Sequence, residues 1–343
     1  VQRSMAPDEA LIQNVVVDGQ IGAFVVRQDR CVLHDDLAAV SDVARLMDAW
    51  RFTLEMFRLY PTEVLHPHMD AWCADAQAHL GRLYQLIFAP LEPLLSEVRR
   101  LYLALYPAML VIPFAALYDG RGYLVERFEV AITMPWCGNG GAALSPRVAI
   151  SSSGHAVVVG YSDGGRLPYA VVEAERVAEV LGKQTTVLLT EDTATEGELR
   201  WHLSSCNLLH LSTHAVFRAD NPFFSWVRLA DAHLTVADLY TLTLPAHPLI
   251  VLSACETGLI GQRGGGLIGL SRALLAAGAS ALVVSLWKVD DAATADLMEA
   301  FYREYTAGLP ATAALRRAQQ RLLAERPHPF YWTPFVFLGR ILN

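Results

Sequence analysis

The sequence predicts an α/β fold, a mostly parallel sheet with helices on both faces, preceded by a smaller α/β region. From about residue 155, short runs of aliphatic and β-branched residues alternate with stretches whose apolar residues recur at helical spacing. Strands that are apolar throughout are typical of parallel sheets covered on both faces. In addition, 53% of the 343 residues are hydrophobic and 18% are charged, so the chain can bury a large core.

The first part of the chain, residues 1–146, is predicted to form the smaller α/β domain. In NVVVDGQIGAFVV, Asp18-Gly19 lies between two β-prone runs, which predicts a hairpin with a tight turn. A long helix is predicted from about Asp36 to Tyr60, and a second over AHLGRLYQLIFAPLEPLL.

The uncharged segment 101–118 is a candidate membrane span by length and composition alone. However, Pro107 and Pro113 divide it into short pieces, for which we predict buried strands and no membrane span. The small-residue stretch CGNGGAALSPR, residues 137–147, is predicted to be a loop between the two parts.

The second part, residues 147–343, is predicted to contain the regular strand–helix alternation. Helices are expected over Tyr169–Leu181, ended by Gly182, and over a later apolar stripe ended by Gly278. Two more helices are expected up to about Ala324. Two pairs resemble helix starts with capping side chains: Thr193 with Glu196, and Thr235 with Asp238. The expected strands are VVVGY, TTVLL, LLHLSTH, LIVLSAC, ALVVSLW and FVFL.

Charge and cysteine usage exclude several classes of protein. A formal net charge of −8 argues against direct nucleic-acid binding, which requires a clustered basic surface. The odd number of five scattered cysteines, with no C-x-x-C pair, fits neither a disulfide framework nor a zinc site. The first residues lack the apolar stretch of a signal peptide. These features predict a cytoplasmic protein without a metal or cofactor.

Two predicted strands end in reactive side chains: LLHLSTH ends at His214 and LIVLSAC ends at Cys255. Sites in open α/β sheets form at the carboxyl ends of strands, and a separation of 41 residues allows the two strands to lie side by side. An imidazole beside a thiol can remove its proton and later return it to a leaving amine. A lone cysteine at a strand end is nevertheless often a packing residue, so the pattern alone leaves both interpretations open.

Residues 157–339 resemble the CHAT domain, a caspase- and separase-like family of cysteine peptidases. The upstream pieces LGRLYQLIFAPL and LVIPFAALYDGRGYLVERFEV resemble the amino-terminal half of the family. The ordered matching segments are LPYAVVEAERVAEVL, TATEGELR, LLHLSTHA, LIVLSACETGL, GGGLIGLSRALLAAGASALVVSLWKVDDAATADLMEAFY, ALRRAQQRL and YWTPFVFLG.

The resemblance implies a caspase-like catalytic subdomain over residues 147–343 and a catalytically silent, pseudo-protease-like scaffold over residues 1–146. It implies endopeptidase activity with a Cys-His dyad, in which Cys255 is the nucleophile and His214 the base. It further implies an oxyanion hole formed by the backbone N–H groups of Ala215 and Cys255. Many relatives have glycine at the position of Ala215, so a requirement for positive φ there would disfavour alanine.

The substrate pocket leaves alternatives open. In separase-like relatives an acidic residue after the Trp-containing strand recognises a basic side chain, and Asp290 or Asp291 in SLWKVDDAATADL occupies that region. The same residues could instead cap the helix that follows. Glu256 could contact substrate or face solvent.

Other features have weaker functional interpretations. GQRGGGLIGLS lacks the G-K-[ST] of a phosphate loop, and its glycines could instead allow a loop after Cys255 to close over substrate. His210 shares a strand face with Ser212 and His214, where it could support the site or be a core histidine. HPHMD, at residues 66–70, has no second ligand cluster and is not expected to bind a metal.

The expected function is therefore cleavage of a protein substrate by an inducible effector in bacterial defence or cell death. Such an enzyme is expected to depend on an activating protein partner or on a sensor region beyond this sequence. The alternatives are a non-catalytic interaction module that retains the fold, and acyl transfer by the same dyad to an acceptor other than water.

Overall fold

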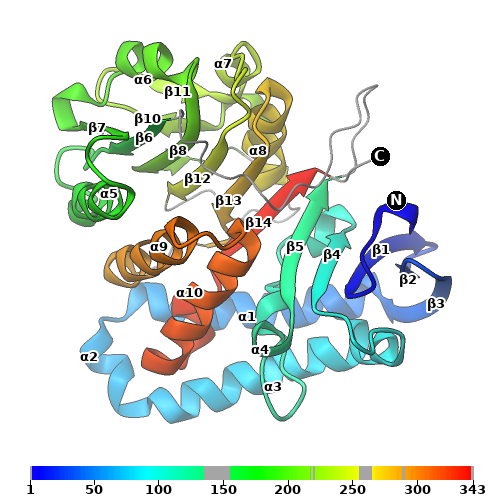
Figure 1. The fold of residues 1–343 in the computed structure, drawn as a ribbon. Coiled ribbons are helices and arrows are strands. Elements are labelled where there is room, and N and C mark those ends of the chain that lie inside the picture. The colour runs from blue at the N-terminus through cyan, green and yellow to red at the C-terminus, as the bar shows by residue number, and fades with distance from the viewer. Residues whose placement is uncertain are drawn as a thin grey trace. The chain divides into compact units, whose positions relative to one another are not determined.

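The computed structural model describes residues 2–134, 155–216, 218, 221–254, 265–287 and 290–340, and the chain divides into two compact units (Figure 1). Unit 1 comprises Val1–Leu144, Leu323–Thr333 and Gly339–Asn343. Unit 2 comprises Ser145–Leu322 and Pro334–Leu338. The chain thus returns to unit 1 near its C-terminus.

The described residues of unit 1 include strands in the order β3-β2-β1-β4-β5. The first three pair antiparallel, whereas β1 with β4 and β4 with β5 pair parallel. The strands are β1 (Glu9–Val17), β2 (Gln20–Val26), β3 (Cys31–Ala39), β4 (Arg100–Ala104) and β5 (Glu129–Met134). The helices are α1 (Val40–Leu59), α2 (Thr62–Leu65), α3 (Met69–Ile87), α4 (Leu124–Arg127) and α11 (Pro329–Trp332), with 3₁₀ turns at Gln2–Ser4, His66–His68, Ala89–Leu94, Pro107–Met109 and Phe114–Ala116.

The predicted hairpin is confirmed. Val17 pairs with Gln20, so the turn consists of Asp18 and Gly19. Both have positive φ, 50° and 79°, as a type I′ turn requires.

Two predictions for this unit are wrong in part. The long helix begins at Val40 and not at Asp36, because residues 36–39 continue strand β3, where Ala38 and Ala39 pair with β2. Segment 101–118 forms strand β4 only up to Ala104, and its proline-containing remainder forms 3₁₀ turns. Among the described residues, none of the helices combines the length and apolar character that crossing a bilayer requires.

An aromatic cluster in unit 1 encloses His328, which is fully buried. Its ring stacks on Phe57 at a centroid distance of 3.9 Å and lies 6.1 Å from Trp50. The Nδ1 atom accepts the N–H of Phe330 at 3.2 Å and caps α11. Because burial disfavours the charged ring, the pKa of His328 falls to about 3. This histidine is therefore a neutral component of the core.

Acid is expected to destabilise unit 1 through His328. The unfolded chain binds a proton at this ring with a pKa of about 6.5, whereas the folded chain does so only at about 3. The free energy of unfolding should therefore fall by about 1.4 kcal/mol per pH unit as the pH drops below about 6.5. Urea unfolding at two pH values, roughly 6.5 and 4.5, should give about 2 kcal/mol less pH dependence for His328→Asn than for the wild type.

Asparagine keeps an acceptor that can cap α11 but lacks the titratable ring. His68→Asn, at an exposed position of the same unit, serves as the control. An unchanged pH dependence in His328→Asn would contradict the assignment.

Unit 2 contains strands in the order β14-β13-β12-β8-β6-β7, of which β13 to β7 pair in parallel. They are β6 (His155–Gly160), β7 (Thr186–Thr190), β8 (Cys206–Thr213), β12 (Leu249–Ala254), β13 (Ala281–Ser285) and β14 (Phe335–Arg340). The helices are α5 (Pro168–Leu181), α6 (Glu196–Leu203), α7 (Val236–Tyr240), α8 (Gly265–Ala277), α9 (Asp291–Thr306) and α10 (Ala311–Glu325), with 3₁₀ turns at Glu191–Thr193 and Pro222–Phe224.

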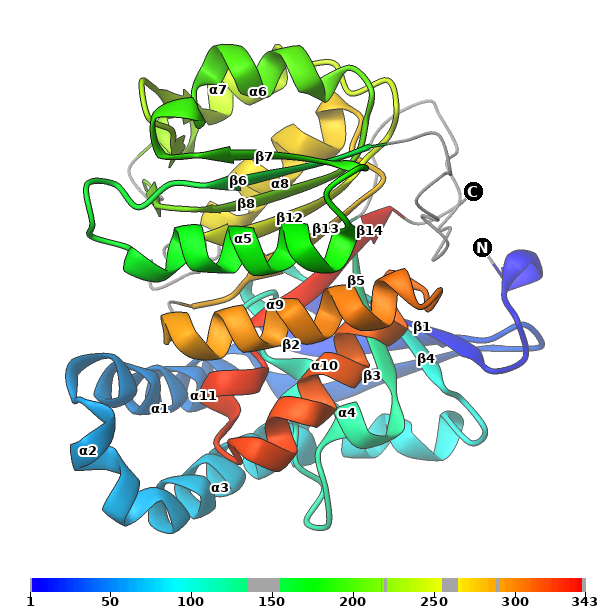
Figure 2. The same cartoon turned by 60° about the vertical axis from the view of Figure 1, so that its left-hand side comes forward.

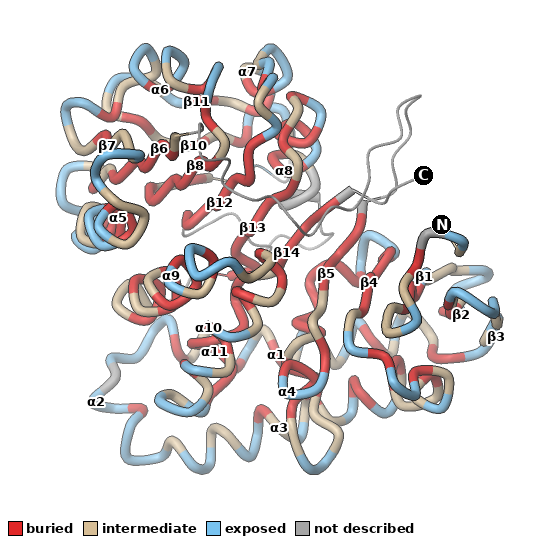
Figure 3. The backbone as a smooth tube through the Cα atoms, in the orientation of Figure 1, coloured by how far each residue is buried: buried red, intermediate tan, exposed pale blue. Residues whose placement is uncertain are grey.

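Helices cover both faces of this sheet, which confirms the predicted class. Helix α5 lies on one face, and α6 and α7 lie on the other (Figure 2). The central strands are buried along their length, whereas the outer sides of the helices are exposed (Figure 3). Gly278 ends α8 with a φ of 123°, where a Cβ atom would approach Leu244 O to 2.7 Å. Gly182 likewise ends α5 with a positive φ.

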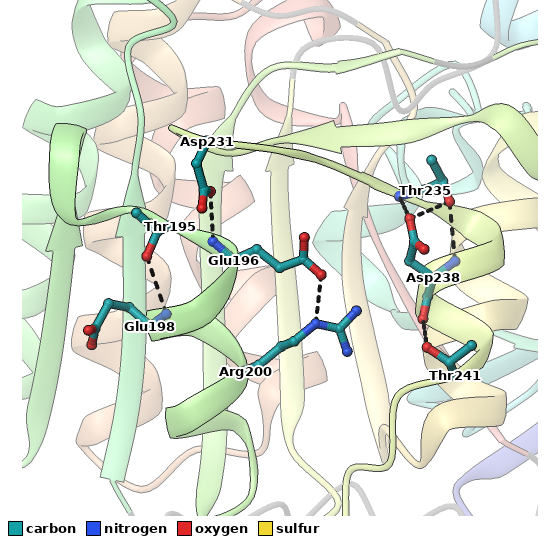
Figure 4. Close-up of polar contacts among 8 residues, drawn as sticks. All are labelled: Thr195, Glu196, Glu198, Arg200, Asp231, Thr235, Asp238 and Thr241. Atoms are coloured by element: carbon teal, nitrogen blue, oxygen red, sulfur yellow. Dashed lines mark hydrogen bonds and ion pairs between the residues drawn. The ribbon is translucent and has the colours of Figure 1, made fainter.

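Of the two predicted helix caps, one is confirmed and one is wrong (Figure 4). Thr235 caps α7, and Asp238 reciprocates as predicted, with its carboxylate accepting the N–H of Thr235 at 2.9 Å. Helix α6 instead begins one residue after Thr195, whose Oγ1 accepts the N–H of Glu198. The proposed pairing of Thr193 with Glu196 is therefore wrong, since Thr193 belongs to the preceding 3₁₀ turn.

A small sheet follows β8 that the sequence did not reveal. Its strands β9 (Ala215–Val216), β10 (Trp226–Arg228) and β11 (His233–Thr235) pair antiparallel in the order β11-β10-β9. The described residues between His214 and Cys255 therefore form three short strands besides α7 and β12.

Candidate functional site

The strands that precede His214 and Cys255 are neighbours, as predicted. Strands β8 and β12 pair in parallel, with Ser212 opposite Ser253 and Thr213 opposite Ala254. His214 follows the first strand in sequence, and Cys255 follows the second. Cys255 and Glu256 themselves lie outside the described residues. The structure therefore describes His214 and two adjacent parallel strands, whose carboxyl ends lie at the same edge of the sheet.

His214 is half-buried, and its main chain is fixed by strand β10. The N–H of Arg228 donates to the carbonyl oxygen of His214 at 2.7 Å. In return, Thr213 Oγ1 donates to the carbonyl oxygen of Arg228 at 2.7 Å. The base predicted from sequence thus stands at the junction of the large sheet and the small one.

A row of side chains extends from the His214 ring across the small sheet. Trp226 lies 5.8 Å from His214 by ring centroids and 4.1 Å from His233. Arg228 Nη1 lies 2.7 Å from His233 Nε2, and Arg228 Nε lies 3.4 Å from Asp163 Oδ1. Burial and the positive charge of Arg228 lower the pKa of His233, against the smaller opposing effect of Asp163. His233 is therefore a neutral imidazole at neutral pH, and its Nε2 atom accepts a hydrogen bond from Arg228 Nη1.

Ala215 is fully buried and lies in β9 opposite Val227. Its φ is not among the positive values found in the described residues. The alanine therefore carries no backbone strain at the position where many relatives have glycine.

Asp290 and Asp291 lie at the start of α9. Asp290 is the N-cap residue, and its Oδ1 accepts the N–H of Ala293 at 2.9 Å. Asp291 is the first residue of the helix. The capping interpretation thus holds for Asp290, whereas Asp291 lies in the first turn of the helix.

A buried polar network includes two residues of β8, Ser212 and His210, and sequence reasoning identified only part of it. Glu173 Oε2 accepts the hydroxyl of Ser212 at 3.0 Å, and Glu173 Oε1 lies 3.1 Å from His210 Nε2. His210 Nδ1 lies 3.1 Å from Tyr302 Oη. All four residues are buried, so His210 is a partnered core histidine. One signal was available: Glu173 falls within the apolar stripe of α5, three residues after Ala170.

Within the described ranges, no three His, Cys, Asp or Glu side chains are grouped so as to hold a metal ion. A cavity of about 720 Å³ lies in unit 1 between α1, α3 and the 118–120 turn. None of the site residues predicted from sequence lines it, so it gives no support to the proposed dyad.

A sequence model of the CHAT domain matches residues 77–340. Tetratricopeptide repeat protein 28 of Homo sapiens is 28% identical over 328 residues, and the mouse protein is 28% identical over 329. Each alignment covers 77% of this chain but only 13% of the relative's length.

Among solved structures, the Saccharomyces cerevisiae separase–securin complex at 3.0 Å matches with a TM-score of 0.62 and 10% identity. The match covers 100% of this chain and 31% of that chain. The 2.6 Å structure of the complex gives a TM-score of 0.60. At this identity the likeness shows a common fold.

Proposed function

Because the chain belongs to the CHAT domain family, we propose that it is a cysteine endopeptidase in which Cys255 is the nucleophile and His214 the base. The observation that carries this proposal is the pairing of β8 with β12. Thr213 and Ala254, which immediately precede the two residues, are opposite each other in adjacent parallel strands. We therefore expect a thiol and an imidazole that follow these strands to lie at the same edge of the sheet.

In this reaction His214 takes the proton of the Cys255 thiol, and the thiolate sulfur attacks the carbonyl carbon of the scissile peptide. The tetrahedral intermediate collapses to a thioester, while the imidazolium gives its proton to the departing amine. Water then attacks the thioester carbonyl and loses a proton to His214. The C–S bond breaks to release the carboxylic acid, and the imidazolium returns its proton to the Cys255 thiolate. The N–H groups of Ala215 and Cys255 are the proposed donors to the oxyanion.

The acidic start of α9 supports a preference for a basic residue before the scissile bond. Asp290 and Asp291 are adjacent carboxylates there, although Asp290 also caps the helix. Glu256 is retained as a second candidate for substrate contact. Cleavage-site profiling with a proteome-derived peptide library tests this preference, since Asp291→Asn should reduce cleavage after Arg or Lys more than after other residues.

The biological role belongs to the same proposal. We place the enzyme in the cytoplasm as an inducible effector of bacterial defence or cell death, activated by a protein partner. The curated relatives are tetratricopeptide repeat proteins of which this chain spans 13%.

Selective alkylation tests the nucleophile directly. With an arginyl chloromethyl ketone at neutral pH, Cys255 is expected to react faster than the exposed Cys31, and Cys206 should not react. Cys206 is buried and donates to Leu208 O at 2.9 Å, and burial raises the pKa of its thiol to about 11. Peptide mapping by mass spectrometry gives the rate for each cysteine. Equal rates for Cys255 and Cys31 would contradict the proposal.

A further inference from the structure

The small sheet that follows β8 fixes the main chain around His214. Ala215 and Val216 pair with Val227 and Trp226, and Arg228 hydrogen-bonds to the carbonyl oxygen of His214. These bonds leave the side-chain torsions of His214 as the remaining freedom of the proposed base. A histidine has several staggered rotamers, of which a dyad needs the one that reaches the thiol.

The indole of Trp226 is the described aromatic group beside this ring. The two rings are 5.8 Å apart by centroids and inclined at 53°. Trp226 also lies against His233, with ring centroids 4.1 Å apart. His233 is in turn held by Arg228, which lies against Asp163, a carboxylate that is 13% exposed.

The indole therefore neighbours both His214 and His233, and Arg228 holds the second of these. A tryptophan braced in this way can exclude rotamers of a histidine, because the bulk of the indole occupies the space into which the imidazole would turn. An exposed tryptophan without such bracing, such as Trp201 on α6, cannot do so.

We propose that Trp226 is a positioning residue for His214, holding the imidazole in the rotamer that faces the end of β12. The catalytic consequence rests on the proposed function, whereas the orientation of the ring does not. A misplacement of the base by about 1 Å can reduce the rate by on the order of 10²-fold, so loss of the indole should affect the chemical step more than substrate binding.

The test compares Trp226→Ala with Trp226→Phe, which keeps an aromatic ring, and with Trp201→Ala as the control. Alkylation of Cys255 and kcat should fall about tenfold in Trp226→Ala, with KM changed less than about twofold. Trp226→Phe should recover most of the loss, and Trp201→Ala should match the wild type. The free energy of unfolding of each variant, measured in urea, should stay close to that of the wild type, which would exclude a general loss of structure.

An NMR measurement separates this inference from the proposed activity. In the wild type, the ring protons of His214 should show nuclear Overhauser contacts to the indole and a single rotamer, whereas Trp226→Ala should show rotamer averaging. If the His214 ring keeps one unchanged rotamer in Trp226→Ala, the inference is overturned, whatever the activity. If averaging appears while wild-type Cys255 is no more reactive than Cys31, the positioning role stands and the proposed peptidase activity fails.

Discussion

Cys255→Ala and His214→Ala are each expected to lower peptide cleavage by at least ~10³-fold. Without the sulfur no thioester forms, and without the imidazole the thiol lacks a group to take its proton and to protonate the leaving amine. The double variant should be no worse than either single variant, because the two residues act as a unit. The measurement is the rate of cleavage of a proteome-derived peptide library at neutral pH.

The matched controls are Cys31→Ala, an exposed cysteine of unit 1, and His202→Ala, a partly exposed histidine of α6. Both should cleave at the wild-type rate. Cleavage that survives in Cys255→Ala would exclude the thiol as the nucleophile. A wild-type chain that cleaves nothing while its Cys255 remains unreactive would favour the alternative of a non-catalytic interaction module.

The features that the sequence predicted best are those with long, uniform apolar patterns. Strands β8 and β12 are buried at almost every position, and each is built around a cluster of aliphatic residues. Their parallel pairing follows from the strand–helix alternation, and the position of His214 at the end of β8 follows from both. The glycine stops at Gly182 and Gly278 were predictable because each requires a positive φ.

The features that were missed are determined by tertiary contacts. Strands β9, β10 and β11 are two or three residues long, too short for an alternating pattern to appear. Residues 36–39 resemble the start of a helix but pair with β2, because the sheet satisfies their backbone groups. Trp226 becomes relevant to His214 only through the pairing of β10 with β9, which the sequence does not signal.

Glu173→Leu is expected to cost about 3–5 kcal/mol of the free energy of unfolding. Glu173 is 4% exposed, and its carboxylate accepts a hydrogen bond from the Ser212 hydroxyl. Its Oε1 atom lies 3.1 Å from His210 Nε2. Leucine has a similar volume but no acceptor, so both polar groups would remain buried without their partner. Glu175→Leu, at an exposed position of the same helix, should change stability by less than about 0.5 kcal/mol. Urea unfolding of the variants measures both effects.

The double variant Glu173→Leu/His210→Leu distinguishes a coupled network from two independent core residues. Removing both members leaves no unpaired imidazole, so the double change should cost at least ~1 kcal/mol less than the sum of the single changes. Additive costs would contradict the coupling. The coupling matters for the site because the network joins α5, β8 and α9 through Glu173, His210 and Tyr302. Strand β8 leads to His214 and α9 begins beside Asp290, so one buried carboxylate braces the elements that carry both the proposed base and the proposed acidic pocket.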